Sequence, residues 1–327
     1  MRDAFGNNRA VAKAPAQHTP STRMSLSAVT KGKVIKSPRV LIYGTNGVGK
    51  TSWAANTPDP IFLPVESGTD QLDVARFPKP ETWQDALDAI HFLTVEDHPY
   101  KTFCVDTVDA LEVLCWAEVC RKYKKETIEE FGFSKGQKVY APKEWFGFLT
   151  ALEKLHEKKG MGVILVGHAR QKTWKNPEGD DFDRFELSVD DKAASLLKDW
   201  SDAVLFARFE TFAAKSDGKR AKGVSTGARV IHTERTAAYD AKNRYSLPDT
   251  LPLDYSAFAE GVERSRVASP EQLRKRIEAL LERAPDLSER VQAAITKAGD
   301  NAQQLAHIEN HLSATINIRE RENHESD

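Results

Sequence analysis

Short apolar runs alternate along most of the chain with longer stretches that are apolar on one face only. The runs are four to seven residues long, which predicts buried strands. They occupy residues 40–43, 61–65, 102–105, 162–166 and 203–209. The predicted helices lie between them, at 50–56, 81–93, 108–123 and 143–158. Continuous apolar strands that alternate with helices indicate a mainly parallel sheet with helices on both faces.

The pattern changes towards the C-terminal end. Residues 229–234 are predicted to pair with the fifth strand as a hairpin around Ser216-Asp217-Gly218. Near Ser265 the strands stop, and Ser269-Pro270-Glu271-Gln272 predicts a capped helix start. Helices are expected over 273–281, 287–297 and 302–316. We divide the chain into an N-terminal arm (1–36), an α/β core (37–264), a helical module (265–318) and a charged tail (319–327).

Positive and negative charges nearly cancel over the whole chain, but they are unevenly distributed along the sequence. The formal net charge is −1 for 327 residues, so a surface for nucleic acid must be a local patch. The segment up to Arg39 carries eight basic residues against Asp3 alone. Its composition predicts a disordered arm, and contact of this arm with nucleic-acid phosphates is left open.

Cysteine usage and apolar runs place the chain in a cellular compartment. Cys104, Cys115 and Cys120 lack paired spacing, so we expect free thiols in a reducing cytosol. No apolar run approaches a membrane span, and the first thirty residues lack the core of a signal peptide. The expectation is a soluble cytoplasmic protein with no membrane partner.

One motif is specific. Gly44-Thr45-Asn46-Gly47-Val48-Gly49-Lys50-Thr51 matches G-x-x-x-x-G-K-[ST], follows an apolar strand and precedes a predicted helix. Backbone N–H groups of such a loop close around phosphates, Lys50 would contact the β- and γ-phosphates, and Thr51 would ligate Mg²⁺. Ser52 completes the predicted phosphate-binding residues. The sequence therefore predicts a site for ATP and Mg²⁺.

Two carboxylates are candidates for chemistry beside this loop. Asp106 ends the third apolar strand, where a second Mg²⁺ ligand is expected. Thr107 follows it, so the glutamate usual at that place in AAA+ ATPases and superfamily-1/2 helicases is absent. Glu66 follows the second strand, faces the ligand crevice, and is expected to orient the attacking water. Asp109 is expected to be a helix N-terminal acid favoured by the helix dipole.

The order of these features resembles the RecA-type recombinases, whose catalytic glutamate lies after the second strand. That resemblance makes His168 the γ-phosphate sensor, a position normally held by Gln; a structural histidine is the alternative. Residues 241–248, Ala-Lys-Asn-Arg-Tyr-Ser-Leu-Pro, resemble the segment whose two cations reach a neighbouring protomer's triphosphate. This gives Lys242 and Arg244 a catalytic role, with a solvated basic turn as the alternative. From Arg39 to Pro248 the chain looks most like the bacteriophage RecA-like nucleotide-binding proteins, which are associated with single-strand annealing and homologous recombination.

The same resemblance implies loops that bind single-stranded DNA. Residues 121–143 carry seven basic residues against three acids, interleaved with Phe131, Phe133 and Tyr140. Phosphate contact and base stacking require this mixture, and we select Phe133, Lys135 and Lys138. A second candidate, 170–191, begins with Arg170 and Lys172 but is then rich in carboxylates. A third is the basic hairpin, with four cations: Lys215, Lys219, Arg220 and Lys222.

We therefore expect a RecA-like P-loop NTPase core, α/β with a mainly parallel sheet covered by helices, plus a small C-terminal helical module. The leading hypothesis is an ATPase that assembles with itself, as a ring or filament, on single-stranded DNA and promotes annealing or recombination. A phage or host single-strand-binding protein is a further candidate partner, and a phage-encoded chain would act in the host cytoplasm. The alternative is an ATP-gated scaffold or replication-module loader partner; a metabolite kinase comes third.

Overall fold

The computed structural model describes residues 28–29, 34–177, 179–216, 219–267 and 269–324, with the backbone alone for 211–216, 219–226, 267, 317 and 319–324. Nearly all of the predicted N-terminal arm lies outside these residues, as do the side chains of the charged tail.

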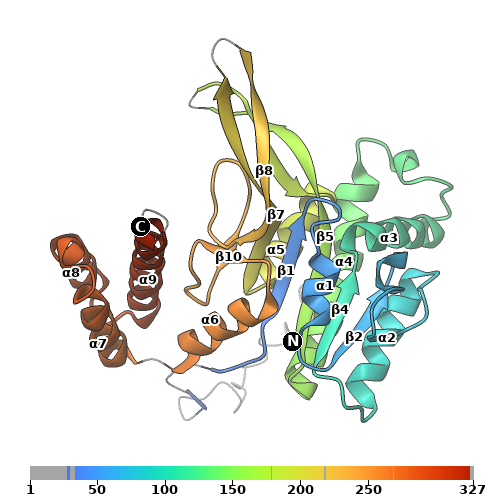
Figure 1. Cartoon of the computed structure of the whole chain (residues 1–327). Helices are drawn as coiled ribbons and strands as arrows, with labels where there is room; N and C mark the ends of the chain where they lie inside the picture. Colours follow the sequence, from blue (N-terminus) through green and yellow to red (C-terminus); the bar gives the residue numbers. More distant parts are fainter. Residues whose placement is uncertain (1–27, 30–33, 178, 217–218, 268, 325–327) are drawn as a thin grey trace, which may run out of the picture. The chain divides into compact units, whose positions relative to one another are not determined.

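The core is built on one mixed sheet (Figure 1). Counted along the chain, its main parallel strands are β1 (Arg39–Gly44), β2 (Pro60–Pro64), β4 (Thr102–Asp106), β5 (Gly162–Trp174) and β7 (Ala203–Ser216). In space they take the order β7–β1–β5–β4–β2, and the short parallel β3 (Ala75–Arg76) follows β2. On the other side β8 (Lys219–His232) pairs antiparallel with β7, and β10 (Thr250–Pro252) with β8. The predicted mainly parallel sheet is confirmed.

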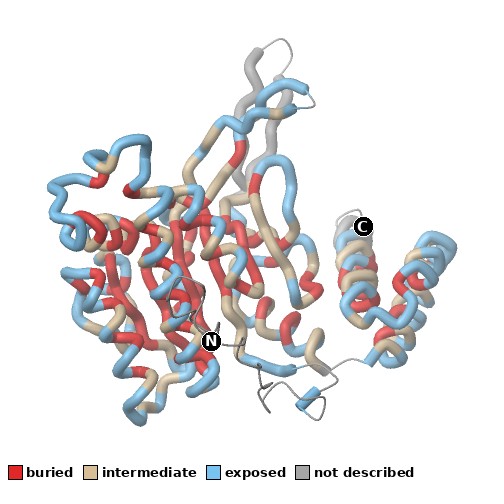
Figure 2. Tube along the Cα trace, turned by 180° about the vertical axis from the view of Figure 1, so that it is seen from behind, coloured by how far each residue is buried: buried red, intermediate tan, exposed pale blue. Residues whose placement is uncertain are grey.

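Helices cover both faces of this sheet. On one face lie α2 (Trp83–Val95), α3 (Val108–Tyr123), α4 (Ala141–Lys159) and α5 (Asp191–Trp200); on the other lie α1 (Lys50–Ala55) and α6 (Tyr255–Val267). Alternate residues of a strand point to opposite faces. Leu41 of β1 accordingly packs in the first cluster and Val40 in the second. Figure 2 shows the strands as the most buried part of the core. The fold is therefore the expected RecA-like P-loop α/β arrangement.

Three strands, β5, β7 and β8, extend well beyond their predicted ranges. β5 continues to Trp174, and its outer half pairs antiparallel with β6 (Phe182–Leu187), so much of 170–191 is a hairpin. β7 and β8 form the hairpin that was predicted between the fifth apolar run and residues 229–234. Residues 217 and 218 of the predicted turn lie outside the described residues. The cations proposed there fall on side chains that are likewise not described. The short β9 (Lys242–Asn243) pairs with the start of β7.

The C-terminal helical module consists of α7 (Pro270–Leu281), α8 (Ser288–Ala298) and α9 (Ala302–His324). The predicted capping box is present: Ser269 accepts from the Gln272 N–H and Gln272 accepts from the Ser269 N–H. Leu273, Ile277 and Leu305 belong to a separate apolar cluster of this module. Among the described residues, no helix is both long and apolar enough to pass through a membrane.

Candidate active site

The predicted phosphate loop links β1 to α1 at the carboxyl edge of the sheet. Gly47 and Gly49 adopt φ values of +71° and +108°, which side chains rarely tolerate. Gly44 is required for a different reason: a Cβ built on it would lie 1.9 Å from the carbonyl oxygen of Ala207 on β7. The loop thus has the backbone freedom that a phosphate cradle needs.

Lys50 lies over this loop. Its Nζ donates to the carbonyl oxygens of Gly44 (3.1 Å) and Thr45 (2.9 Å), and the residue is 5% exposed. Burial lowers the pKa of Lys50, while the carboxylates named below act against that shift. These two contacts hold the ammonium group of Lys50 beside the phosphate loop.

Asp106 and Thr51 supply oxygen atoms beside the loop. Asp106 is 2% exposed, burial raises its pKa, and a hydrogen bond from Thr51 acts in the opposite direction. Its Oδ2 is buried and has no hydrogen-bond partner among the described residues. A Cβ on Gly68 would lie 3.4 Å from this Oδ2 and 3.8 Å from Thr51 Oγ1, so the glycine leaves open space beside both oxygens. A buried oxygen without a partner, next to a hydroxyl, suits a hard cation such as Mg²⁺.

Glu66 lies at the same edge, two residues after the end of β2. Its backbone N–H donates to the Asp106 carbonyl oxygen (3.1 Å), and Thr107 Oγ1 donates to its Oε1 (3.0 Å). The side chain is 41% exposed. The carboxylate is thus oriented by Thr107 yet open to solvent, which a water-orienting group needs.

His168 comes from β5, the strand between β1 and β4, and is paired in register with Gly44. Its backbone N–H donates to Asp109 Oδ1 (2.9 Å), and its Nδ1 lies 2.8 Å from Asp109 Oδ2. Glu66 Oε1 is 4.0 Å from the same nitrogen. Sequence reasoning gave Asp109 only a helix-dipole role. Asp109 is indeed in the first turn of α3, but it also orients His168. The sequence carries no local signal for this contact, because Asp109 and His168 lie 59 residues apart and meet only through the fold.

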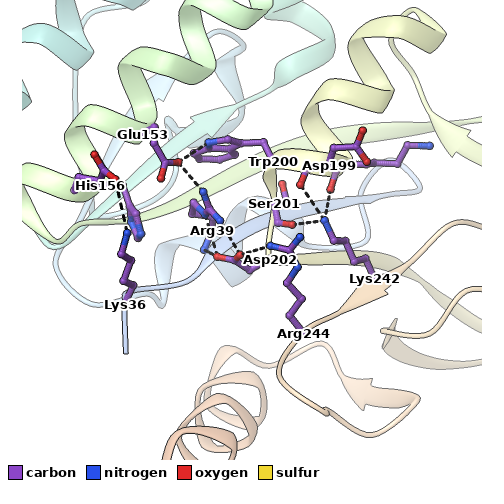
Figure 3. Close-up of polar contacts among 12 residues, drawn as sticks. Lys36, Arg39, Glu153, His156, Asp199, Trp200, Ser201, Asp202, Lys242 and Arg244 are labelled. Atoms are coloured by element: carbon purple, nitrogen blue, oxygen red, sulfur yellow. Dashed lines mark hydrogen bonds and ion pairs between the residues drawn. The ribbon is translucent and has the colours of Figure 1, made fainter. Parts of the chain in front are cut away.

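Lys242 and Arg244 lie elsewhere (Figure 3). β9 pairs with β7 at Ala203, which is level with Val40, at the opposite edge of the sheet from the phosphate loop. Lys242 Nζ donates to three carbonyl oxygens at the end of α5: Lys198 (2.9 Å), Asp199 (3.0 Å) and Ser201 (2.8 Å).

Arg244 Nη1 pairs with Asp202 Oδ1 at 3.0 Å, and its side chain is 51% exposed. Asp202 is shared with Arg39, whose guanidinium also pairs with Glu153 and lies over the Trp200 ring. Arg39, counted with the basic arm, therefore belongs to an internal ion-pair cluster. Neither Lys242 nor Arg244 reaches this chain's own phosphate loop, and their action on a neighbouring subunit stays a prediction.

The first DNA candidate is the connection between α3 and α4, which contains the short helices Ile128–Phe131 and Gly136–Tyr140. Phe133 is 97% exposed and lies between turns, with φ of +48°. Lys135 and Lys138 are exposed as well. Phe131 and Tyr140 differ, because both pack in an aromatic cluster with Tyr123. They hold the connection together and leave Phe133 as its candidate stacking residue.

The second DNA candidate is largely neutralised. Asp191, the first residue of α5, pairs with Arg170 Nη2 (3.0 Å) and Lys172 Nζ (2.8 Å), and Glu186 lies 3.3 Å from Lys172. The carboxylates that the sequence placed after these cations fold back onto them. Contact of Arg170 and Lys172 with a phosphate stays a prediction, and it would require these pairs to open.

The family model described as AAA domain matches residues 36–245. Among curated proteins, the chain is 26% identical over 258 residues to the SPbeta prophage-derived uncharacterized protein YorG of Bacillus subtilis (strain 168), covering 74% of this chain and 72% of that protein. Among solved structures, the crystal structure of the RadB recombinase aligns with a TM-score of 0.37 and 13% identity, over 61% of this chain and 82% of that one.

Proposed function

The chain belongs to the AAA domain family, and on that premise we propose that this P-loop ATPase uses Mg²⁺-bound ATP to assemble on single-stranded DNA and promote annealing or homologous recombination. The observation that carries the proposal is convergence: the phosphate loop, Asp106, Glu66 and His168 meet at one edge of the sheet from separate parallel strands. A prophage-derived relative supports a phage setting for the chain.

Each side chain has a separate task in ATP hydrolysis. The loop amides and Lys50 bind the phosphates, and Thr51 and Asp106 would hold Mg²⁺, which neutralises the phosphate charge when bound. Glu66, fixed by the Thr107 hydroxyl, orients and polarises the attacking water. His168 contacts the terminal phosphate.

Single-stranded DNA would bind first at the α3–α4 connection. The exposed ring of Phe133 offers a stacking surface that tolerates any base, and Lys135 and Lys138 offer charges to the neighbouring phosphates. A single-strand-binding protein of phage or host is a further candidate partner.

The alternative function is an ATP-gated scaffold or replication-module loader partner without strand-pairing activity. One observation favours it: Asp191 and Glu186 neutralise the cations of the second predicted DNA element. An ATPase of that kind would not need a continuous basic path for DNA.

Steady-state ATP turnover with and without single-stranded DNA separates the two functions. We expect turnover that requires Mg²⁺ and rises with DNA, together with DNA-dependent assemblies in electron micrographs. The Lys50→Ala variant is the control and should bind no nucleotide, because it removes the charge-assisted hydrogen bond to the phosphates. Turnover and assembly that are both indifferent to DNA would favour the scaffold.

A further inference from the structure

Both carboxylate oxygens of Asp109 contact His168. One carboxylate oxygen accepts the backbone N–H of His168 and the other contacts its ring Nδ1, at 2.9 and 2.8 Å. Asp109 is anchored in the first turn of α3, and its side chain is only 17% exposed. The backbone contact fixes where β5 places the residue, and the ring contact fixes the orientation of the imidazole.

This contact also decides which ring nitrogen carries a proton. A carboxylate only accepts, so Nδ1 must hold a hydrogen. The remaining nitrogen, Nε2, then depends on the charge of the ring: in neutral imidazole it is an acceptor and would repel a phosphate oxygen, whereas in imidazolium it is a donor. With Nδ1 committed to Asp109, only the cationic ring can donate to ATP.

The groups around the ring favour this cation. Asp109 on α3, Glu66 after β2 and Asp106 at the end of β4 are acidic, and Lys50 on α1 is the opposing cation. The hydrogen bond to Asp109 raises the pKa of His168 above its ordinary value, partial burial acts against this, and the charge of Asp109 adds to the rise.

We propose that Asp109 is a positioning residue that holds His168 as a cationic donor to the terminal phosphate, so that this site distinguishes ATP from ADP by a proton-dependent contact. The inference rests on the proposed function, because it assumes that the site takes ATP. It goes beyond a sensor role for His168 in two respects: it names the residue that sets the state of the ring, and it makes preference for ATP fall as pH rises.

The test measures binding, so it does not depend on hydrolysis. Calorimetry gives the affinity for a non-hydrolysable ATP analogue with an imido β–γ bridge and for ADP, both with Mg²⁺, from pH 6 to 9. The wild type should prefer the analogue about tenfold or more at low pH, as expected for a charge-assisted hydrogen bond, and lose that preference as pH rises. Titration of the nucleotide itself is common to all variants, so comparison between variants isolates the ring.

Two variants separate the roles. Asp109→Asn should shift the loss of ATP preference to lower pH, because the ring loses its anionic partner. His168→Gln should retain only the pH dependence that the nucleotide itself contributes, because an amide donates in any charge state. Asp88→Asn, the same chemical change on the exposed face of α2, should match the wild type.

Nuclear magnetic resonance of the nucleotide-free protein adds an independent readout. The ring signal absent from His168→Gln identifies His168, and its titration midpoint should fall in Asp109→Asn. An unchanged midpoint would overturn the positioning role. An ATP preference that depends on pH as steeply in His168→Gln as in the wild type would overturn the proton-dependent contact. If the protein binds no nucleotide while the midpoint still moves, the proposed function fails and the Asp109–His168 pairing stands.

Discussion

Lys50 and Asp106 carry opposite charges in surroundings that disfavour each of them separately. Burial lowers the pKa of Lys50 and raises that of Asp106. Both shifts fall where a phosphate anion and a divalent cation would bind, and each of these ligands would restore the charged form of its partner. The two residues with shifted pKa values therefore lie at the same place that the sequence motif predicts for the nucleotide site.

Individual site residues differ in how far the sequence can reveal them. Lys50 and Thr51 can be identified from a local motif, because the spacing of its residues determines the conformation of the loop. Asp109 cannot be identified from a local motif, because its partner His168 is 59 residues away and their contact depends on β5 lying beside β4. For Lys242 the sequence suggested a role from its spacing to Arg244. It could not show that three backbone carbonyl oxygens accept hydrogen bonds from the Lys242 ammonium group.

At this scale the sharpest prediction concerns Glu66. Glu66→Gln keeps the size of the side chain and an oxygen for the Thr107 hydroxyl, but removes the charge that polarises water. We expect ATP affinity near that of the wild type and turnover lower by about 10²-fold or more. Turnover should be measured by phosphate release and affinity by calorimetry. Wild-type turnover would move the water-orienting role to another carboxylate, with Asp109 the nearest candidate.

At the scale of elements, α3 holds both ends of the β5–β6 hairpin. Asp109 contacts His168 at its start, and Glu112, one turn along α3, accepts the Asp190 N–H at its end with both oxygens (3.0 and 3.1 Å). The Ser188 N–H closes the base by donating to the His168 carbonyl oxygen (2.8 Å). A displacement of His168 would therefore strain the segment that carries Arg170 and Lys172.

The predicted strands were correct in position, since period and length settle them locally. The outer half of β5 lies in residues 170–191, a segment expected to be a loop that is rich in carboxylates, and no element was predicted over α5. Their order comes from tertiary contacts: Asp191 pairs with Arg170 and Lys172, and Glu112 binds the start of α5. No local pattern encodes these contacts.

Glu112 should make stability depend on pH. Burial raises its pKa to about 7, above the unfolded value of about 4.3. The contribution of Glu112 to the free energy of unfolding is thus fully present below pH about 4.3 and is lost as pH rises through about 7. Glu112→Gln keeps an acceptor for Asp190 and should be stabilised relative to the wild type at pH 8, by on the order of 1–3 kcal/mol, with little difference at pH 4.5. Urea midpoints at both pH values test this, with exposed Glu96→Gln as control; equal differences at both pH values would contradict it.

The α3–α4 connection allows charge and stacking to be separated. Replacing Lys135 and Lys138 by alanine should flatten the salt dependence of single-strand affinity, by about 0.7 in logarithmic slope for each phosphate that is no longer neutralised. Phe133→Ala should weaken binding by about 1–3 kcal/mol with little change in slope. Fluorescence anisotropy at several salt concentrations measures both. Alanines at Lys154 and Lys158, exposed on α4, form the matched control. Complete loss of binding in a chain without residues 1–36 would instead assign DNA contact to the arm.

At the scale of the whole molecule, the sheet separates two sets of predicted catalytic residues. The phosphate loop, Glu66 and His168 lie at its carboxyl edge, whereas Lys242 and Arg244 lie level with the start of β1. One chain cannot bring both sets to one nucleotide without a large rearrangement. If both sets act in hydrolysis, the complete active site therefore needs two copies of the chain.

Mixed assemblies test this arrangement. Arg244→Ala loses an exposed pair with Asp202, worth little in stability, so it should fold and bind ATP. Its turnover should fall, by about 10³-fold if Arg244 stabilises charge on a neighbour's γ-phosphate. Mixing it with Glu66→Gln should restore part of the activity, because one type of interface then carries both wild-type groups. Arg235→Ala, which also removes an exposed arginine paired with an aspartate, is the matched control. A mixture that co-assembles but stays inactive would reject the role in trans.

Gly44 has an evolutionary consequence. The nearest obstacle to a side chain there is the backbone of β7, whose Ala207 carbonyl also accepts the Thr45 N–H. In a descendant that no longer binds ATP, Lys50 and Thr51 could be replaced freely. Gly44 could not, since any side chain there would push β7 away from β1. We expect Gly44 to be conserved in such a lineage after ATPase activity is lost. A homologue that keeps this glycine but lacks the Lys-Thr pair would then be a protein that still folds and no longer hydrolyses ATP.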